Sequence, residues 1–150
     1  MTKKFSVAMV LLCAVCALQS GQAQDKAAAH GTLKVKIHYK GSGSVDEQDK
    51  ILVFLFDTPT FMHGGGAIPF AMMSLNSADG AVTFSDVAKS PVYVSTVYDP
   101  KGAYDGQAAP PAGSSLGIYS KEPGEPAPVN VEPGKNASVE LTFDDAVKMQ

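Results

Sequence analysis

Hydrophobic and polar positions alternate with a period of two in several short segments of this chain. In residues 33–40 every second position is Leu, Val, Ile or Tyr, and the positions between them are Lys or His. Residues 137–143 repeat the pattern with Ala, Val, Leu and Phe. Such alternation predicts strands with one face in the core and the other in solvent.

Residues 51–56, ILVFLF, are apolar at every position. A continuous apolar run of this length, bounded by polar residues, predicts a central strand that is buried on both faces. Further short strands are predicted at 68–75, 81–87, 92–98 and 128–134, with a brief edge segment at 115–120.

Turn signals separate these segments, including a predicted turn at 78–80, ADG, and the proline-rich stretches within 99–128. No window of helical length has the three-and-four spacing of an amphipathic helix. About seven short strands with turn signals between them predict an all-β protein, a single β-sandwich domain.

The first residues predict export. Lys3 and Lys4 precede an apolar stretch of signal-peptide length, and small residues at Gly21 and Ala23 favour cleavage after Ala23. The predicted organisation is therefore a signal peptide at 1–23 and a domain at 24–150, located in the periplasm or secreted. An uncleaved membrane anchor and a lipoprotein remain as alternatives. After cleavage no membrane span is expected.

The amino-acid composition argues against disulfide bonds and against nucleic-acid binding. Both cysteines lie in the predicted signal peptide, so the mature domain has no thiol and can form no disulfide. Removal of Lys3 and Lys4 changes the formal charge from −3 to −5, and the chain has no Arg. An acidic domain without Arg is a poor ligand for phosphate backbones, so nucleic acid is not an expected partner.

Residues 79–102, DGAVTFSDVAKSPVYVSTVYDPKG, resemble the core of transthyretin-like (prealbumin-like) domains, a group that includes carboxypeptidase regulatory-like modules. The shared pattern is a DG turn, an alternating strand, a Tyr-centred strand and a D-x-x-G loop. The residues that carry it are Asp79, Gly80, Val82, Phe84, Tyr93, Asp99 and Gly102. The resemblance implies a β-sandwich and a non-enzymatic role in binding or assembly.

The expected function is thus an exported, non-catalytic binding or accessory module. It would present loops 57–76 and 99–127 to a protein, glycan or small-molecule partner. The first loop holds Phe and Met residues beside a Gly triplet, which suits a lip over an apolar pocket. The predicted binding surface consists of Phe61, His63, Phe70, Tyr104 and Tyr119. The sequence does not indicate an oligomeric state.

A metal-binding protein is the alternative. Asp99 and Asp105, with Asp57, could supply carboxylates to calcium, although Asp99 and Asp105 also suit the turn that ends a strand. Met62, His63, Met72 and Met73 are ligands that suit copper, although Met and Phe are also common gap-filling core residues.

Catalysis has little support in the sequence. There is no G-x-S-x-G motif, and the mature chain has no Cys nucleophile. A hydrolase that uses His38 or His63 is the third hypothesis. We expect that the protein is not an enzyme and that it needs no cofactor, unless it binds calcium.

Overall fold

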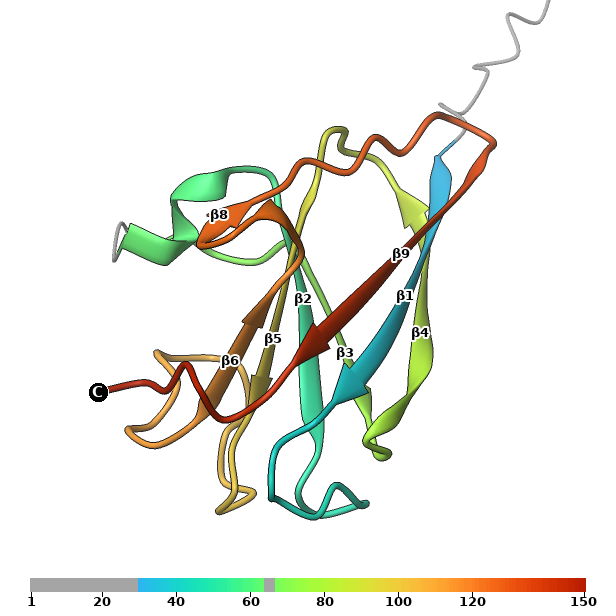
Figure 1. Ribbon diagram of the computed structural model, residues 1–150. Helices are drawn as coiled ribbons and strands as arrows, with labels where there is room; N and C mark the ends of the chain where they lie inside the picture. The colour runs from blue at the N-terminus through green and yellow to red at the C-terminus, as the bar shows by residue number, and fades with distance from the viewer. Residues whose placement is uncertain (1–29, 64–66) are drawn as a thin grey trace, which may run out of the picture.

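The computed structural model of the protein describes residues 30–63 and 67–150 (Figure 1). The predicted signal peptide lies outside these residues. The described residues form nine strands and one 3-10 helix: β1 (Gly31–Tyr39), β2 (Ile51–Phe56), η1 (Pro59–His63), β3 (Ala71–Leu75), β4 (Asp79–Val87), β5 (Tyr93–Tyr98), β6 (Ser115–Ile118), β7 (Ser120–Glu122), β8 (Glu125–Pro126) and β9 (Asn136–Phe143). The all-β prediction is confirmed.

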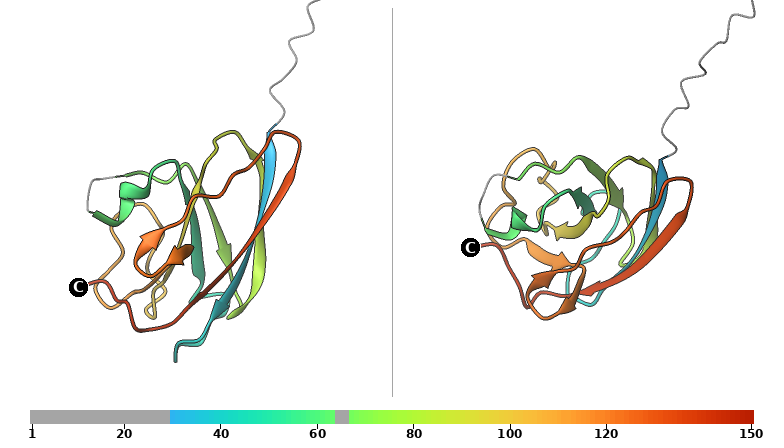
Figure 2. Two further views of the ribbon diagram at one scale, coloured as in Figure 1. Left: turned by 45° about the horizontal axis from the view of Figure 1, so that its top comes forward. Right: turned by 90° about the horizontal axis from the view of Figure 1, so that it is seen from above.

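The strands form two main sheets that pack face to face (Figure 2). One has the order β4-β1-β9, in which β1 is antiparallel to β4 and parallel to β9. The other has the order β3-β2-β5-β6, and all of its neighbouring strands are antiparallel. The short strands β7 and β8 pair only with each other.

A single apolar core fills the space between the sheets. Strand β1 contributes Leu33, Val35, Ile37 and Tyr39, while the lysines between them face away from the core. Strand β9 contributes its alternate residues in the same way. The period-two prediction is therefore confirmed for both strands.

Strand β2 is buried at all six positions. Ile51, Val53 and Leu55 belong to the core between the sheets. Leu52, Phe54 and Phe56 form a second cluster with Val97 on the opposite face of the same sheet. The prediction of a central strand with two buried faces is confirmed, and the second cluster marks a second layer of packing.

The predicted turn at 78–80 is displaced towards the N-terminus, since residues 76–78 connect β3 to β4. Strand β4 begins at Asp79, and Gly80 pairs with Ile37 of β1. The irregular alternation further along β4 has a local cause. Asp86 has a positive φ of 57°, and the β1–β4 register shifts between Val87 and Phe84. This bulge adds one residue and returns Val87 to the core.

One other expectation needs correction. Residues 128–134 do not form a strand and make only an isolated bridge, between Val129 and Val92. Prolines at both ends of this segment limit regular pairing. Tyr93, one of the residues that carry the resemblance, is half-buried and packs against the second cluster. In the part of the chain that the structure describes, no helix is long and apolar enough to cross a membrane.

Two adjacent residues of β5 differ in how their hydroxyls are satisfied. Ser95 Oγ donates to the carbonyl of Gly117 at 3.1 Å. Thr96 is fully buried between the sheets, and its Oγ1 has no hydrogen-bond partner among the described residues. A buried hydroxyl without a partner destabilises the folded state.

We therefore predict that Thr96→Val raises the free energy of unfolding by about 1 kcal/mol, because Val keeps the shape and removes the unsatisfied hydroxyl. Ser95→Ala is the matched control and should lower it by about 1 kcal/mol, because it removes a satisfied bond. Urea unfolding measures both. A Thr96→Val protein that is as destabilised as Ser95→Ala would contradict the prediction.

Asp145 ties the end of β9 to two other elements. Its carboxylate accepts hydrogen bonds from the hydroxyls of Tyr39, at 2.6 Å, and Ser115, at 2.7 Å, and from the amide and hydroxyl of Ser42, both at 2.9 Å. The Ser42 amide, followed by these hydroxyls, holds the pKa of Asp145 well below its usual range. Burial, together with the carboxylate, raises the pKa of Tyr39 to about 12.

These pKa shifts predict a loss of stability at both extremes of pH. Because the pKa of Asp145 is lowered in the folded state, its ionised carboxylate contributes to stability. This contribution is complete above about pH 4, the pKa of Asp in the unfolded chain, and it is lost as pH falls below that value. Because the pKa of Tyr39 is raised in the folded state, its protonated phenol contributes to stability. This contribution is present below about pH 10, the pKa of Tyr in the unfolded chain, and it is lost as pH rises towards 12.

Asp145→Asn should lower the free energy of unfolding at neutral pH by about 1–3 kcal/mol, the range for hydrogen bonds to a charged group. The difference from the wild type should shrink as pH falls through the acid range. Asp46, Asp57 and Asp79 also have lowered pKa values, and they are the same in both proteins. A difference that is constant between pH 7 and pH 2 would show that Asp145 is not responsible.

Candidate functional site

The outer face of the β3-β2-β5-β6 sheet is the most distinctive surface of the molecule. The sheet face that points away from β4-β1-β9 carries the second apolar cluster. Two connections lie over this face, one formed by residues 57–63 with η1 and residues 67–70, and the other by residues 99–114 (Figures 1 and 2). The C-terminal residues reach it as well, because Leu116 of β6 donates its amide to the carbonyl of Val147 at 2.9 Å.

The connections cover the face incompletely and leave a groove of about 810 Å³. This volume is within the range of about 300–1,000 Å³ that is typical of small-molecule sites. The groove is lined by Phe54, Phe56, Phe61, Ala67, Ile68, Pro69, Phe70, Ala71, Met72, Ser95, Val97, Tyr104, Gly106, Gln107, Ala108, Ala109, Pro110, Leu116, Ile118, Gly124, Val147 and Met149. None of these lining residues is charged.

Aromatic rings run along the groove as a continuous row. Phe61 stacks on Phe56 with ring centroids 4.3 Å apart and an interplanar angle of 11°. Phe56 is followed by Phe54 at 6.3 Å, and Phe54 by Tyr104 at 6.2 Å. The row joins η1, β2 and the 99–114 connection, so both connections contribute to one apolar surface.

Large apolar side chains are exposed at this groove. Among the described residues, four large hydrophobic side chains are exposed, and three of them line the groove: Ile68 at 83 %, Val147 at 56 % and Met72 at 42 %. The fourth, Met73, lies next to Met72 on β3 but points to the other face, since it pairs with Val53 while Met72 pairs with Phe54. Clustered exposure of this kind marks a binding surface.

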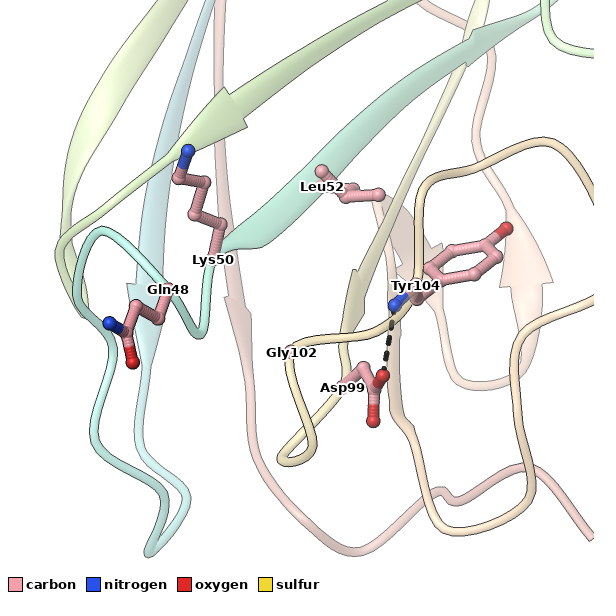
Figure 3. Close-up of a pocket in the computed structure, with 6 residues that line it drawn as sticks. All are labelled: Gln48, Lys50, Leu52, Asp99, Gly102 and Tyr104. Atoms are coloured by element: carbon pink, nitrogen blue, oxygen red, sulfur yellow. Dashed lines mark hydrogen bonds between the residues drawn. The ribbon is translucent and has the colours of Figure 1, made fainter.

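Asp99 fixes the conformation of the loop after β5, which carries Tyr104 and forms one wall of the groove. It is buried, and its carboxylate accepts hydrogen bonds from the amides of Lys101, Ala103 and Tyr104, each at 3.0 Å. Figure 3 shows the carboxylate directed at the Tyr104 amide, with Leu52 on the neighbouring strand β2 and Lys50 just before that strand. The small hollow drawn there, of about 190 Å³, also includes Gln48 and Gly102.

Tyr104 continues from this loop into the groove. Its hydroxyl donates to the carbonyl of Ala108 at 3.0 Å. Burial, with the charge of Asp105 as the smaller cause, raises the pKa of the Tyr104 phenol, so the ring remains neutral at physiological pH. The next residue of the loop that lines the groove, Gly106, has a φ of 82°, and a Cβ there would clash with Met72 Sδ. The loop therefore needs Gly at this point to approach the groove floor.

Asp57 does not join the other two predicted calcium ligands, Asp99 and Asp105. Asp57 follows β2 at the end where Phe56 pairs with Tyr93, whereas Asp99 follows β5 at the opposite end of the same pair. Asp57 forms an ion pair with Lys89, and the Asp105 carboxylate accepts from the amide of Gln107. Asp99 and Asp105 thus serve the turn that the sequence also allowed. Among the side chains that the structure describes, which exclude that of His63, no cluster of three or more His, Cys, Asp or Glu suited to a metal occurs.

The predicted copper ligands are divided. Met72 lines the groove, and Met73 lies on the other side of β3. The side chains of Met62 and His63 lie outside what the structure describes, as does the Gly triplet at 64–66. His38, the other histidine considered for catalysis, is on the outer face of β1, where its ring contacts Asp79 and Glu140.

The predicted binding surface is located in part. Phe61, Phe70 and Tyr104 line the groove. Tyr119 does not, because it packs against the core between the sheets. Leu116, Val147 and Met149 also line the groove and were not predicted to do so. The signal for Val147 and Met149 was the alternation of apolar and polar residues at 147–150.

Comparisons with protein-family models, with curated proteins and with solved structures found no match to this chain.

Asp99→Ala should lower the free energy of unfolding by about 2–3 kcal/mol, because three main-chain amides lose a charged acceptor. Asp105→Ala, which removes one acceptor on the exposed side of the same loop, should cost less than about 1 kcal/mol. Urea unfolding compares the two variants. Equal losses would contradict the assignment of Asp99 as the residue that holds the loop.

Proposed function

We propose that this protein is an exported, non-catalytic binding module that uses the groove on the outer face of the β3-β2-β5-β6 sheet. The observation that carries the proposal is the lining of the groove, which is uncharged throughout and includes three of the exposed large apolar side chains. A surface of this kind costs free energy in water, and a bound partner removes that cost.

Export and fold class rest on the sequence. The charged and apolar segments of 1–23 support a cleaved signal peptide and a periplasmic or secreted location. The facing sheets are consistent with a transthyretin-like β-sandwich, in which the 79–102 pattern spans β4 and β5 and the start of the loop held by Asp99. The resemblance adds a preference for binding over catalysis.

The two covering connections support the location of the binding face. They contribute Phe61 and Tyr104 to one aromatic row, although they are separated by the whole of β3, β4 and β5. Loops on a rigid sheet scaffold are common positions for binding residues. A protein, glycan or small-molecule partner would meet the molecule on this side.

A fluorescence titration with Nile red, an uncharged dye that reports accessible apolar sites, tests the proposal. We expect the folded wild-type domain, residues 24–150, to bind the dye, and Ile68→Asp to weaken binding at least about tenfold by placing a charge at the groove. The side chain of Ile68 is 83 % exposed, so the substitution should leave the melting temperature nearly unchanged.

Thr83→Asp is the control, since Thr83 is exposed on β4 in the other sheet. It should leave dye binding unchanged. A folded wild-type domain that does not bind the dye, or dye binding that both variants weaken equally, would overturn the groove as the binding face.

A further inference from the structure

Three polar side chains, those of Ser95, Tyr104 and Gln107, are among the described residues that line the groove, and the two hydroxyls are already engaged within the protein. The hydroxyl of Tyr104 donates to Ala108, and the hydroxyl of Ser95 donates to Gly117. Neither can donate to a ligand without losing its present bond. Sugars need many hydrogen bonds from a site, so this lining does not suit a glycan.

The floor of the groove is a sheet face and not a strand edge. Side chains of Phe54, Phe56 and Val97 stand between a ligand and the main chain of β2 and β5. A polypeptide segment laid on this floor would place its own amides and carbonyls against aromatic rings that cannot pair with them. Unpaired main-chain groups in a water-excluded site are costly, so this floor does not suit an extended peptide.

The lining of the groove also does not suit a charged ligand. No Asp, Glu, Lys, Arg or His is among the described residues that line the groove. The cation beside them, Lys89, lies 5.1 Å from the centroid of the Phe70 ring and is already paired with Asp57. The cost of removing an unpaired carboxylate or ammonium from water would then oppose binding.

From these observations we infer that the groove takes a small, uncharged, apolar molecule that lies along the aromatic row from Phe61 to Tyr104. This inference rests on the proposed binding function and names the ligand class for the same site. The volume of about 810 Å³ accommodates a molecule of drug or lipid-fragment size. Stacking on the rings and burial of apolar surface supply the affinity.

Displacement of Nile red from the folded domain by 1-decanol, decanoate and decylammonium tests the inference, because these probes share one alkyl chain and differ in charge. We expect decanol to displace the dye at a concentration at least about tenfold lower than either ion, with little dependence on salt. Each probe is used below its critical micelle concentration.

Two neighbouring substitutions provide a matched pair. Met72→Lys places a cation in the groove, and Met73→Lys places one on the same strand outside it; the two side chains are 42 % and 38 % exposed. Met72→Lys should weaken decanol binding at least about tenfold, and Met73→Lys less than about threefold. Thermal melting confirms that each variant is folded.

The outcomes separate the two proposals. Dye binding with equal or stronger displacement by decanoate or decylammonium would overturn the ligand class and leave the binding face in place. Equal effects of Met72→Lys and Met73→Lys would overturn the aromatic row as the position of the ligand. Absence of dye binding would overturn the binding face itself. Because the ion comparison uses the wild-type domain, it stands even where a variant fails to fold.

Discussion

Strand β2 sets the constraint on which the rest of the structure depends. Its six residues are all apolar and buried, so both of its faces must be covered. The β4-β1-β9 sheet covers one face and completes the main core. A two-layer arrangement leaves the other face to the connections, and this is why the long segments 57–70 and 99–114 carry Phe and Tyr where ordinary loops carry polar residues.

Carboxylates hold these irregular segments in place. The described residues contain no Cys, so the long connections cannot depend on disulfides. Asp99 organises one connection through three main-chain amides, and Asp145 joins β1, β6 and the 42–43 turn through hydroxyl and amide donors. Hydrogen bonds to an ionised acceptor are stronger than neutral ones, which suits them to the fixing of segments without regular pairing.

The strands could be predicted from the sequence where buried residues recur at a regular spacing. Alternation located β1 and β9, and the uniform apolar run located β2 with both faces buried. The start of β4 and the irregular segment at 128–134 were mispredicted, because Asp79-Gly80 has turn chemistry and the valines near 130 have strand chemistry. Tertiary pairing, which local sequence does not encode, decided both cases.

The candidate site was less predictable because it is built from distant residues. Phe61 and Tyr104 were chosen for their place in long aromatic loops, and they do line the groove. Val147 and Met149 reach it only because the C-terminal segment pairs with β6, a long-range contact with no local signal. Asp57 and Asp99 were grouped because each follows an apolar strand, but antiparallel pairing of those strands sends them to opposite ends.

The same polar contacts explain why the groove stays open. An apolar surface in water tends to close, and here the wall that would have to move is held by Asp99 and by the Tyr104–Ala108 hydrogen bond. Gly106 already touches the floor near Met72, so the loop can approach no further without displacing that side chain. A site with fixed walls loses little conformational entropy when a ligand enters. More of the free energy gained by burying apolar surface therefore remains as affinity than in a site whose loop becomes ordered on binding. The engagement of the polar groups that hold the wall is also what leaves the groove without hydroxyl donors for a ligand, so the rigidity of the site and its preference for apolar molecules have the same physical origin.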